Sequence, residues 1–341
     1  MKIAITADPE IPVPPHLYGG IERIIDGLAH QYRKAGHKVW LCAHESSTCT
    51  LVEALFAWPG KTSVNKFDTA KNALFLRNTV HEIRPDIVHS FSRLLYLYPT
   101  LLTTSVPVVQ SYQRAINARS TGLARKIGGK RLLFTACARH MTKHLSWAHE
   151  WHTVYNFTDT EYFNPSTNKR TCLAFLGRIE PIKGASEAVQ VALKTGLPLK
   201  IAGNVPPEHQ GYFDRQINPH LGSQIEYIGP VNDEQKRTLL QGALAMLFPI
   251  LWEEPFGIVM AESMACGTPV IAFNRGSVPE VIENGINGFV CTNVDEMASA
   301  LKRIHLIDNQ YVIKSAVQKF SANVIGKHYL NLFNKILEAG K

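Results

Sequence analysis

The sequence lacks long apolar runs and clustered cysteines. No stretch of its 341 residues reaches the roughly 18 apolar residues that a membrane-spanning helix requires. The six cysteines are Cys42, Cys49, Cys137, Cys172, Cys266 and Cys291. They form no CxxC pair or zinc-spaced His/Cys cluster, which favours reduced cysteines packed as small hydrophobes. Because the N-terminus reads as a strand without a signal-peptide cleavage pattern, we expect a cytoplasmic protein.

Charged residues are also scarce, at 19% of the chain, whereas apolar residues make up 45%. This composition excludes a disordered or coiled-coil protein and supports sizeable buried cores. The length predicts two domains. Internal repeats and low-complexity segments are absent.

Acidic residues are missing from much of the first half. No Asp or Glu lies between Asp86 and Glu150, where nine Lys or Arg residues occur. Residues 1–160 carry 19 basic and 11 acidic residues, whereas residues 161–341 carry 17 of each. The excess predicts an anionic partner for the first domain, such as a phospholipid surface or an acidic acceptor; a solvated basic face is the alternative. Nucleic acid is not expected, because no aromatic interleaving or known binding motif accompanies the charge.

Short apolar runs alternate with helical patterns through both halves. Strands are predicted at residues 2–6, 38–43, 86–91, 106–110, 132–136, 152–156, 172–176, 197–202, 225–229, 244–248 and 269–273. Helices are predicted at residues 21–32, 185–193, 233–240, 258–265 and from 294 onward. This alternation indicates two doubly wound, Rossmann-like α/β domains, residues 1–160 and 161–321, with a polar linker near 156–170. Ligands of such sheets bind at the carboxyl ends of the strands, so two facing domains would share an interdomain cleft.

Two glycine-containing loops are candidate phosphate sites. Gly19 and Gly20 stand where the first helix begins, so backbone N–H groups can approach an anion; a tight turn is the simpler interpretation. Gly177 opens a second loop that carries Arg178 and Lys183, which can offset two negative charges; a solvated basic loop is the alternative.

The third candidate segment contains two carboxylates, Glu254 and Glu262, with seven residues between them. Carboxylates accept hydrogen bonds from vicinal hydroxyls, so one can hold a sugar and the other a ribose, while the intervening helix start faces a diphosphate. A surface-helix pair is the alternative, but Glu262 lies in the apolar stretch IVMAESMA, where an unpaired carboxylate is costly. No Asp-x-Asp occurs in the chain. We therefore expect a nucleotide-sugar site whose diphosphate charge is offset without a metal ion.

The chain resembles the retaining family-4 glycosyltransferases, which have the GT-B fold, over nearly its full length. The resemblance rests on the motifs YGGIE, GRIEPIKG, EPFGIVMAE, CGTPVIA and GSVPEVIENGINGFV. It implies a metal-independent transferase that binds a nucleoside diphosphate sugar mainly on the second domain and the acceptor on the first. It also implies that the last helix, near residues 322–341, packs back on the first domain.

The resemblance assigns a role to each candidate residue. Arg178 and Lys183 contact the diphosphate and stabilise the leaving group, and Gly20 donates its N–H. Glu254 binds donor-sugar hydroxyls and Glu262 binds the ribose. Main-chain groups complete the site at Phe256, Gly257 and Ile258, for the sugar and phosphate, and at Val231, for the base.

The sequence departs from the family at Gln113, which stands where members often carry a His against the donor sugar. A Gln can hydrogen-bond a hydroxyl but cannot shuttle a proton. Either the chemistry does not need the His, or the protein has lost activity. His89 matches a His common in the family and either meets the acceptor or is a core histidine.

Together these observations predict a hexosyl transferase of cell-envelope polysaccharide biosynthesis. UDP-sugars are the favoured donors, with GDP-sugars next, and the acceptor is a glycan, a lipid-linked intermediate or another anion. Peripheral contact with an anionic membrane is expected. The alternative is a noncatalytic nucleotide-sugar-binding or scaffold protein of the same fold.

Overall fold

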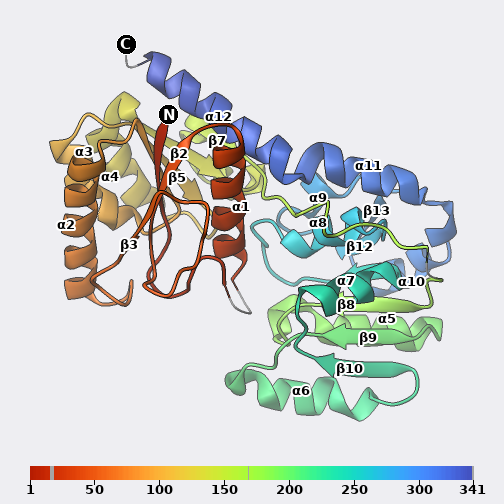
Figure 1. Ribbon diagram of the computed structural model, residues 1–341. Coiled ribbons are helices and arrows are strands. Elements are labelled where there is room, and N and C mark those ends of the chain that lie inside the picture. The colour runs from red at the N-terminus through yellow and green to blue at the C-terminus, as the bar shows by residue number, and fades with distance from the viewer. Residues whose placement is uncertain (16–18, 168, 340–341) are drawn as a thin grey trace. The chain divides into compact units, whose positions relative to one another are not determined.

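The chain divides into two compact units in a computed structural model, which describes residues 1–15, 19–167 and 169–339 (Figure 1). Unit 1 comprises Met1–Asn156 and Ala322–Lys341, and unit 2 comprises Phe157–Ser321. The sequence placed the boundary after residue 160, four residues later than the structure does. It also predicted that the last helix joins the first domain, as this division has it.

The described residues of unit 1 form a seven-stranded parallel sheet in the order β3-β2-β1-β4-β5-β6-β7. The strands are β1 (Lys2–Thr6), β2 (Lys38–Ala43), β3 (Ala54–Ala57), β4 (Ile87–Ser90), β5 (Val108–Tyr112), β6 (Leu132–Ala136) and β7 (Trp151–Thr153). The helices are α1 (Gly20–Lys34), α2 (Lys66–Ile83), α3 (Tyr98–Thr103), α4 (Ala118–Gly128) and α12 (Ala322–Ala339). Short 3-10 turns are η1 (Leu94–Leu97), η2 (Gly129–Arg131), η3 (Arg139–Thr142) and η4 (Ala148–Glu150).

In unit 2 the described residues form a six-stranded parallel sheet in the order β10-β9-β8-β11-β12-β13. The strands are β8 (Cys172–Leu176), β9 (Leu199–Ala202), β10 (Ile225–Gly229), β11 (Ala243–Phe248), β12 (Val270–Phe273) and β13 (Gly288–Cys291). The helices are α5 (Ala185–Thr195), α6 (Gln210–Gln216), α7 (Asp233–Gln241), α8 (Ile258–Ala265), α9 (Val278–Val281), α10 (Val294–Leu301) and α11 (Asn309–Phe320). Short 3-10 turns are η5 (Pro181–Lys183), η6 (Pro207–His209), η7 (Asn218–His220) and η8 (Ile304–Leu306).

The central strands are apolar because helices cover both faces of each sheet. Every residue of β4 and β8 is buried, and β1 is buried after its first residue. Continuous apolar runs of this kind are typical of parallel strands, whereas strands exposed on one face alternate. The two predicted Rossmann-like domains are therefore confirmed.

Each sheet has one point where its strand order reverses. In unit 1, β1 pairs with β2 on one side and β4 on the other. In unit 2, β8 pairs with β9 and β11 in the same way. Helices that follow the two central strands leave in opposite directions at such a point, so the loops at the carboxyl ends part and leave room for a ligand.

The last helix belongs to the core of unit 1. α12 packs against α1, and its Tyr329 and Phe333 rings lie 4.4 Å and 5.3 Å from the ring of His89. Tyr329 is 2% exposed and Phe333 is fully buried. This helix therefore completes the core of the first domain although 165 residues of unit 2 precede it.

Candidate functional site

The loops after β8 and β11 approach closely in unit 2. Gly184, the last residue of the loop after β8, has φ +77°, and a Cβ there would lie 1.9 Å from the carbonyl oxygen of Pro249, just past β11. Only glycine fits such a conformation so near another backbone. The basic loop and the acidic loop predicted from sequence therefore lie side by side at the switch point.

This approach joins Lys183 and Glu254. The Lys183 ammonium lies 2.5 Å from Oε2 of Glu254, and the Trp252 indole N–H donates to the same oxygen at 2.8 Å. The ammonium also sits 5.0 Å from the centre of the Trp252 ring, within reach of a cation–π contact. With 17% and 13% of their side chains exposed, Lys183 and Glu254 can both reach a ligand at this edge.

Arg178 lies in the same loop and pairs with Glu180. The guanidinium Nη2 is 2.9 Å from Oε1 of Glu180, whose other oxygen is 3.7 Å from the ring of His209. Glu180 is buried, whereas 38% of the Arg178 side chain is exposed. Glu180 therefore anchors a guanidinium that keeps part of its surface open to solvent.

Glu262 is buried in α8 and pairs with a lysine from α7. The Lys236 ammonium lies 2.5 Å from Oε1 of Glu262 and 3.3 Å from Asp233. Glu262 is 4% exposed, and its Oε2 has no hydrogen-bond partner among the described residues. The alternative of a solvated surface carboxylate is wrong, because the side chain lies inside the fold.

The remaining unit 2 candidates lie at the same carboxyl edge. Gly257 caps α8 with φ +72°, where a Cβ would be 2.8 Å from the Phe248 ring, and Ile258 begins the helix. The Phe256 side chain is buried, so its backbone alone is available. Val231 is half-buried just after β10, and Gly177 directly follows β8.

In unit 1, Gly19 caps α1 and Gly20 is its first residue. Tyr18, which opens the same motif, lies outside the described residues. Close by in sequence, Glu22 is 6% exposed, and burial raises the pKa of its carboxyl.

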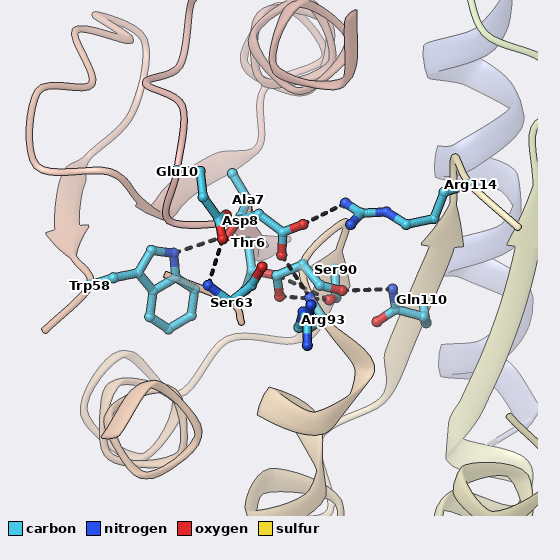
Figure 2. A network of polar contacts seen from close by, with 11 residues as sticks. Thr6, Ala7, Asp8, Glu10, Trp58, Ser63, Ser90, Arg93, Gln110 and Arg114 are labelled. Atoms are coloured by element: carbon cyan, nitrogen blue, oxygen red, sulfur yellow. Dashed lines mark hydrogen bonds and ion pairs between the residues drawn. The ribbon is translucent and has the colours of Figure 1, made fainter. Parts of the chain in front are cut away.

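A second polar network surrounds the carboxyl ends of β1, β4 and β5 in unit 1 (Figure 2). Asp8 accepts hydrogen bonds from the Arg93 backbone N–H at 2.9 Å and from the Arg114 guanidinium at 2.5 Å, one on each oxygen. Burial raises the pKa of the Asp8 carboxyl, although Arg114 acts in the opposite direction. Asp8 is buried, but 53% of the Arg114 side chain is exposed. Asp8 thus holds Arg114 with part of its guanidinium facing solvent.

Gln113 is partly buried beside Arg114. Its Oε1 accepts a hydrogen bond from Asn156 at 2.7 Å, and its Nε2 has no partner among the residues described. The amide thus has a donor group available where the family often carries an imidazole.

The prediction that His89 faces an acceptor is wrong. The ring is fully buried in β4, with Nδ1 3.0 Å from the Tyr32 hydroxyl and Nε2 2.8 Å from the Ser111 hydroxyl. Burial lowers the pKa of His89 to about 3, so the imidazole is neutral. The structure supports the core-histidine alternative.

None of the described helices has both the length and the apolar content that crossing a bilayer requires. No group of three or more His, Cys, Asp or Glu side chains among the described residues has an arrangement able to hold a metal ion.

The structure thus joins Lys183 with Glu254 and gives Glu262 a basic partner, all within unit 2. Sequence reasoning missed Trp252, Lys236, Glu180 and Asp8 as members of these clusters. The apolar residues on both sides of Glu262 in the sequence indicated that its carboxylate needs a partner. Nothing in the sequence identified that partner as a lysine 26 residues away.

Family models match almost the whole chain in two adjoining parts. The model described as Glycosyltransferase Family 4 matches residues 18–162, and the one described as Glycosyl transferases group 1 matches residues 158–324. With the two parallel-sheet units, these matches define a glycosyltransferase of the GT-B class. The chain belongs to glycosyltransferase family 4.

Individual proteins agree with this assignment. N-acetyl-alpha-D-glucosaminyl L-malate synthase of Bacillus anthracis is 23% identical over 212 residues, or 55% of each chain. The chain spans about half or less of the length of the curated relatives it matches.

Two solved structures show the same fold over nearly their full lengths. AviGT4, a glycosyltransferase involved in Avilamycin A biosynthesis, has a TM-score of 0.77 and 24% identity, covering 99% of this chain and 98% of its own. Anabaena HepE in complex with UDP and glucose has a TM-score of 0.75 and 18% identity, covering 98% of this chain and 99% of its own.

Proposed function

We propose that this protein is a retaining glycosyltransferase that moves a hexosyl group from a nucleoside diphosphate sugar to an acceptor hydroxyl. The observation that supports this most is the joining of Lys183 and Glu254 at the unit 2 switch point. A lysine beside a carboxylate offers a positive group for a diphosphate and an acceptor for sugar hydroxyls within one short distance.

Arg178 and Lys183 offset the charge that develops on the departing diphosphate. Preorganised positive groups of this kind stabilise a transition state more effectively than water does, because they need no reorganisation. The bond from the anomeric carbon to the phosphate oxygen breaks, and a bond to the acceptor oxygen forms on the same face. The acceptor proton passes to the departing phosphate, so no protein base is required and Gln113 is tolerated.

UDP-sugars are the favoured donors and GDP-sugars the next choice. HepE, a protein with the same fold, was solved with UDP, which is consistent with this preference. A base held through the main chain near Val231 leaves few side-chain marks of its identity.

The acceptor is a glycan, a lipid-linked intermediate or another anion. Arg114 is partly exposed at the carboxyl edge of unit 1, where Asp8 holds it. The Bacillus anthracis relative is named for L-malate, which is an anion at neutral pH. An anionic acceptor therefore fits both the charge of unit 1 and one relative's name.

Peripheral contact with an anionic membrane, at the inner face of the cell-envelope membrane, is also proposed. Adjacent helices of unit 1 expose large apolar residues on α2 (Phe67 and Leu74), α3 (Leu102) and α4 (Leu123). Exposed lysines and arginines lie on two of these helices, Lys66 and Lys71 on α2 and Arg119 and Lys126 on α4. Co-sedimentation with vesicles of phosphatidylglycerol should fall as salt rises. Binding that ignores both lipid charge and salt would contradict this contact.

A donor panel tests the catalytic proposal. The protein is incubated with UDP-, GDP-, ADP- and TDP-glucose, and release of free nucleoside diphosphate is followed with and without EDTA. We expect slow hydrolysis of at least one donor, unaffected by EDTA. A noncatalytic scaffold, which the replacement of His by Gln113 favours, would bind a donor and raise the melting temperature without releasing the sugar.

A further inference from the structure

The ammonium of Lys236 is surrounded on three sides. It lies 2.5 Å from Glu262, 3.3 Å from Asp233 and 4.7 Å from the centre of the Phe163 ring. Only 13% of the Lys236 side chain is exposed. Such a desolvated ammonium interacts more strongly with its carboxylate partners than a surface lysine does.

Lys236 and Glu262 come from separate helices. Lys236 lies in α7, whose capping box at Asn232 and Gln235 fixes the first turn, and Glu262 lies in the middle of α8. A pair between two packed helices fixes the position of the carboxylate relative to both. Lys236 thereby links Glu262 to the segment after β10, which carries Val231.

The pair occupies only one of the two carboxylate oxygens. Lys236 donates to Oε1 of Glu262, whereas Oε2 is buried with no hydrogen-bond partner among the described residues. Buried polar atoms nearly always have a partner. An ionised carboxylate is an acceptor only, so the missing partner is a hydrogen-bond donor such as a hydroxyl.

We infer that Lys236 is a positioning residue of the donor site, which holds Glu262 so that Oε2 accepts the hydroxyls of the nucleotide ribose. This inference rests on the proposed binding of a nucleoside diphosphate sugar to unit 2. Lys236 itself does not touch the donor. It supplies a positive partner for Glu262 inside the fold and fixes which oxygen the ligand meets.

If Lys236 and Glu262 formed a purely structural pair, breaking it would lower the stability of the fold. It would not change the preference of the protein between nucleotides that differ only in their ribose hydroxyls. The informative quantity is therefore the ratio of two affinities, for UDP and for 2′,3′-dideoxy-UDP, which cancels a general loosening of the site.

Lys236→Met keeps the length and the apolar stem of the side chain but removes its charge and its donors. By isothermal titration calorimetry, the wild-type protein should bind UDP at least about tenfold more tightly than the dideoxy analogue. The variant should lose most of this preference through weaker binding of UDP, while its affinity for the analogue stays within about threefold.

Lys194→Met is the matched control. Lys194 also pairs with a carboxylate in unit 2, Asp295, but at the last turn of α5 and with half of its side chain exposed. The wild-type preference should persist in this variant. If Lys236→Met does not fold, Lys236→Gln is measured against the same two nucleotides under the same criterion.

The outcomes separate the two levels of the proposal. An unchanged preference in the Lys236 variant, or an equal loss for both nucleotides, overturns the positioning role. If UDP, GDP, ADP and TDP all fail to bind the wild-type protein, the proposed function falls instead. Where GDP binds and UDP does not, GDP and 2′,3′-dideoxy-GDP replace the uridine pair.

Discussion

The two switch points of this molecule differ in how far their polar groups are satisfied by the chain itself. In unit 1, both oxygens of Asp8 and both ring nitrogens of His89 have partners. In unit 2, the buried Glu262 has one oxygen without a partner among the described residues. The buried carboxylate at the unit 1 switch point is thus fully paired by the chain, whereas the buried carboxylate of unit 2 is not. The amides of Gln110 and Gln113 in unit 1 each keep one atom without a partner among the described residues, but neither carries a charge. A ligand hydroxyl is expected at the unpaired carboxylate oxygen of unit 2.

The net charges of the two units also differ. Unit 1 carries 22 basic and 11 acidic residues, whereas unit 2 carries 14 basic and 17 acidic residues. The charged candidates for ligand binding nevertheless lie in unit 2, as pairs between separate elements, Lys183 with Glu254 and Lys236 with Glu262. Net charge therefore points to a surface partner of unit 1, and paired charges point to the site of unit 2.

Among the variants, Lys183→Met should cause the largest loss of ligand affinity. The variant removes a positive group from the diphosphate and leaves Glu254 to repel it, so UDP affinity should fall by roughly 100-fold. Uridine affinity should change little, because uridine carries no phosphate. Calorimetry with both ligands measures this, and Lys200→Met, which alters an exposed pair with Glu226 in the same unit, serves as control. A loss below twofold would remove Lys183 from the site.

Glu254→Gln should affect the sugar more than the nucleotide. The amide keeps one oxygen acceptor but loses the charge, so donor turnover should fall about tenfold or more. UDP affinity should remain within about threefold, because UDP lacks the sugar. Steady-state hydrolysis of the active donor, compared with UDP titration, separates the two. Equal losses in both would show that Glu254 instead supports Lys183.

His89 should make the stability of unit 1 depend on pH, which a phenylalanine at the same position would not do. Because burial lowers its folded pKa to about 3, from an ordinary 6.5, unfolding takes up a proton between these values. Stability is therefore fully present above pH 6.5 and falls by up to about 1.4 kcal/mol for each pH unit below it.

The measurement is the difference in slope between wild type and His89→Phe in urea unfolding from pH 7 to pH 5. The raised pKa values of Asp8 and Glu22 act in the opposite direction above their ordinary values, but they are common to both proteins. Parallel slopes would contradict the buried neutral imidazole.

Lys194→Met should have the smallest effect. Its pair with Asp295 is exposed, and such pairs contribute at most about 1 kcal/mol to the free energy of unfolding. In urea unfolding, the free energy of unfolding of the variant should differ from that of wild type by no more than this amount. The loss should be much smaller than the loss for Lys236→Met. Similar losses at the two lysines would mean that burial does not distinguish the pairs.

Much of the fold follows from the sequence because its strands are continuous apolar runs. Residues 2–6, 38–43, 132–136, 172–176 and 225–229 are strands with the predicted bounds. The helix α2 was not predicted, because its outward face carries Phe67 and Leu74 and it therefore shows no single apolar stripe. The short strands β3 and β13, of four residues each, were not predicted either.

The candidate site was predictable by residue type but not by pairing. The motifs identified Lys183, Glu254 and Glu262, since each residue type suits one part of a nucleotide sugar. Their partners depend on which loops and helices meet, which the local pattern does not encode. Lys236, three residues after Asp233, looks like an ordinary helix-surface charge until α7 is packed on α8.

The most direct test of the account is calorimetric titration of UDP, and then GDP, into wild type, Glu262→Ala and Asp8→Asn. The account predicts that one of these nucleotides binds wild type and Asp8→Asn alike and binds Glu262→Ala at least about 30-fold more weakly, with the fold of each variant checked by thermal melting. Unchanged affinity in a folded Glu262→Ala protein would contradict it.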